Sequence, residues 1–184
     1  AALDLTAERA GIADGMRVLD LGCGWGSLSL WIAEHFPGTQ VVSVSNSSSQ
    51  SAFINDQARR RSISNVETIV CDMNDFDAEQ KFDRVVSVEM FEHMRNYREL
   101  FRRIDSWLLP NGQFFMHIFC HRTTPYEYQD KGPADWMSRH FFTGGIMPSA
   151  NLPLRFADNL QIAKQWQWNG SHYAKTSNAW LANM

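Results

Sequence analysis

Along the first 120 residues, hydrophobic and polar positions follow two patterns, one typical of strands and one typical of helices. Short, mostly apolar runs predict five strands, at 18–21, 40–45, 66–71, 82–88 and 113–120. Between them, apolar residues recur at helical spacing and predict helices over 3–11, 27–36, 50–61 and 97–108. Pro110, Asn111 and Gly112 are typical of a helix stop, which would end the last of these helices. The order is strand and helix in regular alternation.

This alternation predicts an α/β fold with a mostly parallel, doubly wound sheet. The strands are apolar along their whole length, as expected when helices cover both faces. In such a sheet, ligands bind beyond the carboxyl ends of the strands. We therefore expect a site near Gly22, Asn46, Asp72, Glu89 and Cys120.

The rhythm breaks after residue 120. Residues 121–155 contain four prolines, the pair Gly144-Gly145 and several aromatic residues, and they are too many for a simple connection. We interpret them as a lid or substrate-pocket insertion, with an irregular packing segment as the alternative. Residues 161–168 predict a further strand, and residues from 176 to 181 predict the start of another helix. All 184 residues are interpreted as one domain.

Charge and cysteine content narrow the class of protein. The formal net charge of −3 implies no general attraction to nucleic acid or to anionic membranes. No apolar run reaches the ~18 residues of a membrane span, although peripheral lipid contact stays open. Cys23, Cys71 and Cys120 are odd in number and far apart, so neither a disulfide framework nor a metal site is expected, and the reducing cytoplasm is the default compartment.

The first predicted strand leads into a glycine turn, with Gly22, Gly24 and Gly26 before a helix at Ser27. Closely spaced glycines let backbone N–H groups approach a ligand. The spacing G-x-G-x-G differs from the dinucleotide fingerprint G-x-G-x-x-G, which makes a nicotinamide-dependent oxidoreductase the weakest hypothesis. Asp20, two residues before the first glycine, suits a cationic ligand such as S-adenosylmethionine (SAM).

Three motifs identify a family resemblance: Val-Leu-Asp-Leu-Gly-Cys-Gly-Trp-Gly from residue 18, Glu-Met-Phe-Glu-His from residue 89, and Leu-Leu-Pro-Asn-Gly from residue 108. With them the chain resembles the class I SAM-dependent methyltransferases, and within these the cyclopropane fatty-acid synthase and coclaurine N-methyltransferase-like group. The resemblance implies a Rossmann-like fold. It also implies N- and C-terminal family segments that we expect this chain to lack.

The resemblance assigns the cofactor-binding residues by position. Asp20, Gly22, Gly24 and Gly26, with Cys23 between them, resemble the residues that hold the methionine part of SAM. Ser45, Asn46 and Gln50 match the loop that contacts the ribose, and Asp72 and Met73 match the pair that contacts adenine. The predicted cofactor-binding residues are therefore Asp20, Gly22, Cys23, Gly24, Gly26, Ser45, Asn46, Gln50, Asp72 and Met73.

Glu89, Glu92 and His93 form the candidate catalytic cluster. A helical turn here would place all three on one face. An amine acceptor must lose a proton before it attacks the methyl group, and a nearby carboxylate or imidazole can take that proton. In the N-methyltransferases that the chain resembles, matching positions are implicated in binding and deprotonating the amine. This favours methyl transfer to a small amine.

Two alternatives stay open. Cyclopropane synthases use a bound bicarbonate as base, held by residues that match Glu92, His117, Tyr173 and the main chain near Phe119. Glu89, however, replaces a residue that is often Gly in those synthases. The other alternative is a catalytically silent SAM-binding or interaction domain. The acceptor and the oligomeric state stay open.

Overall fold

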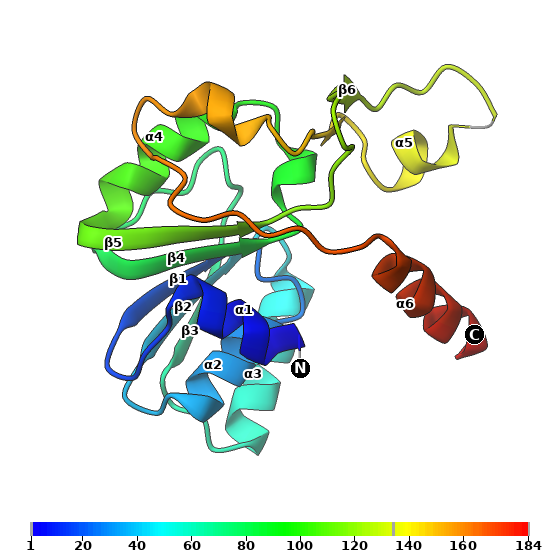
Figure 1. The fold of residues 1–184 in the computed structure, drawn as a ribbon. Coiled ribbons are helices and arrows are strands. Elements are labelled where there is room, and N and C mark those ends of the chain that lie inside the picture. Colours follow the sequence, from blue (N-terminus) through cyan, green and yellow to red (C-terminus); the bar gives the residue numbers. More distant parts are fainter. Residues whose placement is uncertain (1, 134, 184) are drawn as a thin grey trace.

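The computed structural model describes residues 2–133 and 135–183, and within them a five-stranded sheet forms the centre of the molecule (Figure 1). The strand order is β3-β2-β1-β4-β5, and every neighbouring pair is parallel. The strands are β1 (Arg17–Leu21), β2 (Gln40–Ser45), β3 (Val66–Val70), β4 (Phe82–Val88) and β5 (Leu108–His117). The predicted parallel α/β fold is confirmed.

Helices cover both faces of the sheet. In Figure 1, one group of helices lies against one face of the sheet, and α4 lies against the other. The first group is α1 (Ala2–Ala10), α2 (Ser27–His35) and α3 (Ser48–Arg60), and α4 is Tyr97–Trp107. Leu100, Phe101 and Ile104 of α4 are buried against β1, β4 and β5, because their i, i+1, i+4 spacing puts them on one stripe.

The strand order places the expected site at a topological switch point. β1 is followed in the chain by its neighbour β2, and β4, which pairs with the other edge of β1, is followed by its neighbour β5, so the connections from the carboxyl ends of β1 and β4 leave in opposite directions. The crevice that results lies between the turn after Leu21 and the turn after Val88.

The predicted helix stop at Pro110-Asn111-Gly112 is wrong. α4 ends at Trp107 and β5 begins immediately at Leu108, so Pro110-Asn111-Gly112 lies inside the strand and stops no helix. The register with β4 shifts between Phe82 and Arg84, and Asn111 has φ 67°, which marks a bulge. β5 also ends at His117, three residues before the predicted boundary.

Residues 121–155 hold short elements on the side of the sheet where the strands end. β6 (Tyr126–Glu127) and β7 (Ile146–Met147) pair antiparallel, and α5 (Trp136–His140) lies between them in the chain. A turn of 3₁₀ helix, η2 (Pro153–Phe156), then packs beside α4. In Figure 1, the β6–α5 region extends away from the sheet. Its assignment as a lid stays a prediction.

The strand predicted at 161–168 is wrong. Within the described residues, this segment pairs with no β-strand. Side-chain contacts hold it in place instead. Gln165 Nε2 donates to the Ala150 carbonyl, and Trp166 and Trp168 lie against the guanidinium of Arg9. The final helix, α6 (Ser171–Ala182), begins five residues earlier than predicted. None of the described helices is long and apolar enough to cross a membrane.

Candidate functional site

The glycine turn after β1 is open at its centre. Gly22, Gly24 and Gly26 all have positive φ, at 75°, 55° and 76°. A Cβ on Gly22 would lie 2.5 Å from the Met90 side chain, and one on Gly26 would lie 2.5 Å from Ile54. A Cβ on Gly24 would meet nothing within 4 Å. Two glycines therefore allow close packing, while Gly24 faces open space in which a ligand can approach the backbone.

Several backbone amides of this turn donate hydrogen bonds within the protein. Gly22 N–H and Cys23 N–H both donate to the Val44 carbonyl at 3.0 Å, so they fasten the turn to β2. Gly26 N–H donates to Cys23 O at 2.9 Å. The amides of Gly22, Cys23 and Gly26 therefore close the turn, and the approach of the Gly24 amide to a ligand stays a prediction.

Asp20 is a buried carboxylate beneath the turn. Its side chain is 2% exposed, and Oδ2 accepts a hydrogen bond of 2.6 Å from Ser29. Burial raises the pKa of Asp20 to about 6, against the smaller opposing effect of the Ser29 bond. Burial, with a smaller contribution from Asp20, also raises the pKa of Cys23 to about 12, so this thiol stays neutral. A cation that reached Asp20 would stabilise its charged form.

A cavity of about 260 Å³ joins the glycine turn to the end of β5. Four predicted cofactor residues line it, namely Asp20, Gly22, Cys23 and Gly24, together with the predicted catalytic residue His117. The sequence reasoning missed the rest of the wall: Ala2, Leu3 and Thr6 of α1, Ser27 and Leu28 of α2, Val88 and Trp168. The helical pattern of residues 3–11 located α1, but no sequence signal placed it beside Gly24.

The predicted ribose and adenine residues lie at the ends of β2 and β3. The Ser45 hydroxyl donates to Gln50 Oε1 at 2.6 Å, and Asn46 beside them is exposed. Asp72 is exposed and accepts from the Asn74 backbone and side-chain amides at 2.8 Å, while Met73 packs against the core. None of the five is among the described residues that line the cavity, and their contacts with a cofactor stay predicted.

Glu89 follows β4 with φ 56°, in the left-handed region that non-glycine residues rarely adopt. Its carboxylate accepts a hydrogen bond from the Tyr173 hydroxyl, and Oε1 lies 3.9 Å from His117 Nδ1. This backbone conformation also removes Glu89 from the helical turn that follows. The prediction that Glu89, Glu92 and His93 share one helical face is therefore wrong.

Glu92 lies in η1 (Phe91–His93) and is 0% exposed. Its Oε1 accepts a 2.8 Å hydrogen bond from Phe119 N–H, while Oε2 is buried without a partner among the described residues. Burial raises the pKa of Glu92 to about 7, and the charge of Glu89 contributes in the same direction. A buried carboxyl with one free oxygen is suited to proton transfer near neutral pH.

The two candidate histidines, His93 and His117, have different surroundings. His93 stacks on Phe142, with ring centroids 5.1 Å apart, and burial lowers its pKa. Burial also lowers the pKa of His117, although Glu89 opposes the change. His117 contacts the Trp168 ring at 5.1 Å, so both line the cavity described above. Both imidazoles are therefore favoured in the neutral form.

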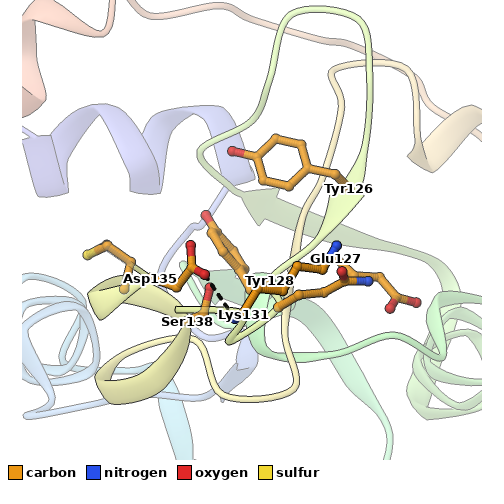
Figure 2. Close-up of a pocket in the computed structure, with 8 residues that line it drawn as sticks. Tyr126, Glu127, Tyr128, Lys131, Asp135 and Ser138 are labelled. Atoms are coloured by element: carbon orange, nitrogen blue, oxygen red, sulfur yellow. Dashed lines mark hydrogen bonds between the residues drawn. The ribbon is translucent and has the colours of Figure 1, made fainter. Parts of the chain in front are cut away.

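The insertion has a hollow of its own, with a volume of about 430 Å³ (Figure 2). Tyr128 forms part of its wall, and the Tyr128 ring stacks on Phe142 at 4.7 Å. Asp135 lies across from it and accepts a 2.9 Å hydrogen bond from Lys131 N–H. The sequence indicated an aromatic insertion but not this hollow. Over residues 2–133 and 135–183, no cluster of three or more His, Cys, Asp or Glu side chains is placed to hold a metal ion.

Comparisons with known proteins agree on one family. A family model described as mycolic acid cyclopropane synthetase matches residues 1–184. A (S)-coclaurine N-methyltransferase from Thalictrum flavum subsp. glaucum is 39% identical over 186 residues, covering 100% of this chain and 52% of that protein. A cyclopropane-fatty-acyl-phospholipid synthase from Escherichia coli (strain K12) is 31% identical over 182 residues, covering 98% and 45%.

Solved structures give the same picture. A crystal structure of coclaurine N-methyltransferase bound to N-methylheliamine and S-adenosylhomocysteine (SAH) is 39% identical, with a TM-score of 0.92. The match covers 98% of this chain and 54% of that one. A mycolic acid cyclopropane synthase with SAH has a TM-score of 0.80 at 24% identity, which shows the shared fold. The chain spans about half the length of the curated relatives it matches.

Proposed function

Because the chain belongs to the mycolic acid cyclopropane synthetase family, we propose that it is a SAM-dependent methyltransferase whose acceptor is the amine nitrogen of a small molecule. When bound, SAM supplies a methyl group on a positively charged sulfur and leaves as SAH. The open backbone at Gly24 and the buried carboxylate of Asp20 support binding of such a cation at the cavity they line.

The observation that carries the amine assignment is the conformation of Glu89. A left-handed φ costs a non-glycine residue roughly 1–2 kcal/mol, and glycine adopts it freely. The resemblance to cyclopropane synthases would lead us to expect Gly here, yet this chain has a glutamate at φ 56°. As a second carboxylate near Glu92, Glu89 would attract a cationic amine, and that attraction would offset the cost of its backbone conformation. A neutral alkene would gain nothing from the Glu89 charge.

Glu92 is the proposed base. Its unpartnered Oε2 can accept the proton that the ammonium acceptor must lose, while Phe119 N–H holds Oε1 in place. With a pKa of about 7, Glu92 becomes a competent base as the pH rises through neutrality. His93, whose ring stacks on Phe142, is proposed to form part of the wall on which the acceptor packs.

A bound bicarbonate fits these residues poorly. Tyr173 donates to the carboxylate of Glu89, and Phe119 N–H donates to Glu92, so two of the expected anion-holding donors are engaged by carboxylates. An anion between Glu89 and Glu92 would also meet two negative charges. The lipid alternative therefore has less support than the amine.

The test is a paired assay with SAM carrying a labelled methyl group. One arm offers heliamine, the amine whose N-methyl form the coclaurine N-methyltransferase structure contains. The other offers vesicles of unsaturated phospholipid with bicarbonate. We expect label in the amine. Bicarbonate-dependent label in the lipid alone would replace the proposal, and calorimetric SAM binding without turnover in either arm would indicate a silent binding domain.

A further inference from the structure

The insertion touches the proposed catalytic turn through a glycine that has no space for a side chain. Gly145 is buried, and a Cβ on it would lie 2.4 Å from the carbonyl oxygen of Glu92 and 3.4 Å from His93 Cα. The φ of Gly145 lies outside the left-handed region, so its backbone conformation alone would permit alanine. The contact with Glu92 is therefore what requires glycine here.

Hydrogen bonds hold this glycine in place. Gly145 N–H donates to Phe142 O at 2.9 Å, and Tyr128 N–H donates to Gly145 O at 3.2 Å, next to the β6–β7 pair. Arg95, two residues after His93, donates from Nε to the Gly144 carbonyl at 2.6 Å. The same guanidinium lies 3.5 Å from Glu127 Oε1. Arg95 thus ties the turn to β6 and to the residue pair that precedes β7.

Aromatic side chains continue the contact. Phe142, 3% exposed, lies between the rings of His93 and Tyr128, at centroid distances of 5.1 and 4.7 Å. Phe119, whose N–H bonds Glu92, lies 5.2 Å from the same ring. Backbone packing, an ion pair and ring contacts therefore connect the insertion to the turn that contains Glu92 and His93.

We propose that Arg95, Phe142, Gly144 and Gly145, here called the insertion clasp, position Glu92 and His93 for the reaction, in addition to any part the insertion has in covering the pocket. η1 contains three residues, and a 3₁₀ turn of that length holds its shape only through tertiary contacts. The clasp rests on the proposed function, because it gives Glu92 the fixed geometry that a base needs.

Gly145→Ala tests the clasp, and Gly132→Ala is its matched control. Gly132 lies in the same insertion, and a Cβ there would meet nothing within 4 Å. Both variants and the unchanged protein are prepared with SAH and no acceptor. In Gly145→Ala we expect faster hydrogen exchange of the Phe119 amide and a His93 pKa, followed by NMR titration, that rises toward its ordinary value. SAH affinity should stay within about twofold in both variants, because neither glycine lines the cofactor cavity.

Turnover of heliamine is the second readout. Gly145→Ala should lower kcat by about 10²-fold, the scale of a misplacement near 1 Å, while Gly132→Ala should not change it. A Gly145→Ala protein with unchanged Phe119 exchange and His93 titration overturns the clasp. If heliamine is not methylated even by the unchanged protein, the proposed function fails, and the NMR readouts still decide on the clasp.

Should Gly145→Ala fail to fold, Arg95→Ala replaces it, because about half of the Arg95 side chain is exposed. The control is Arg139→Ala, which removes a similarly exposed arginine from its pair with Asp130 in the same insertion. Arg95→Ala should change His93 and Phe119 in the same sense as Gly145→Ala, and Arg139→Ala should not. Equal behaviour of the two arginine variants would overturn the clasp.

Discussion

The two halves of the site are built in opposite ways. The cofactor half comes from the ends of β1, β2 and β3, and its closest residues, Asp20 to Ser29, are ten consecutive positions of one strand-turn-helix unit. The acceptor half draws Glu89 and Glu92 from one turn, Phe119 from the residues after β5, Phe142 and Gly145 from the insertion, and Tyr173 from α6. The glycine-turn part of the cofactor half is local, although α1, His117 and Trp168 complete its cavity, and the acceptor half is assembled across more than 80 residues of chain.

The difference has a physical consequence. In the cofactor half, close packing against Met90 and Ile54 and ladder hydrogen bonds hold the turn, so a change there should affect binding directly. In the acceptor half, the proposed base depends on contacts made by remote segments. Substitutions in the two halves should therefore separate SAM affinity from turnover.

Gly24→Val should have the largest effect. A branched side chain would fill the space that Gly24 leaves open, so SAM affinity should fall at least about 10²-fold by calorimetry. Gly15→Val is the control, since Gly15 also has positive φ and an open Cβ position but lies before β1. Comparable loss of SAM binding in both variants would mean that backbone strain, not the ligand space, is responsible.

Glu92→Gln should lower kcat by about 10²-fold and leave SAM affinity within about twofold. Gln retains an acceptor for Phe119 N–H but cannot take a proton. The loss should shrink at high pH, where free amine is abundant. Glu99→Gln, an exposed acid paired with Arg102 on α4, is the control. A loss of the same size at every pH would contradict the role of Glu92 as a base.

Asp20→Asn should separate stability from affinity. The pKa of Asp20 is about 6 in the folded protein and ~3.9 in the unfolded chain, so its contribution to stability is complete below about pH 4 and is lost as the pH rises through 6. The variant should therefore gain about 3 kcal/mol in urea unfolding at pH 8 and little at pH 4. SAM affinity should fall about tenfold. A gain of equal size at both pH values would show that the folded carboxyl is not perturbed.

Tyr173→Phe should have the smallest effect, below about threefold in kcat for an amine, because Glu89 keeps its charge without the hydroxyl. Phenylalanine also preserves the ring contact with Phe119. In a cyclopropane synthase the same change would remove a ligand of the anion. A severe loss that bicarbonate partly restores would move the acceptor half toward the lipid chemistry.

The predictions from sequence succeeded where neighbours in the chain are neighbours in space. The five parallel strands, the helices between them and the glycine turn follow from apolar period and turn chemistry. The predictions failed where the structure of a segment depends on which distant segment it contacts. Residues 161–168 alternate like a strand, but they are held by Arg9 and Ala150 and join no ladder in the described chain. Pro110 to Gly112 resemble a helix stop and form a bulge, because β4 pairs on both sides of them.

The sequence by itself determined the fold class, the family and the types of residue available at the site. Strand period, glycine spacing and the acids near residue 90 are local features of the sequence. They can be interpreted without knowing which distant segments they contact. The tertiary structure decided which of those residues meet. It took Glu89 out of the helical turn that contains Glu92, buried Glu92 with one free oxygen, and set Gly145 against the Glu92 carbonyl. Burial and contact between distant segments set pKa values and positions, and those depend on the whole chain.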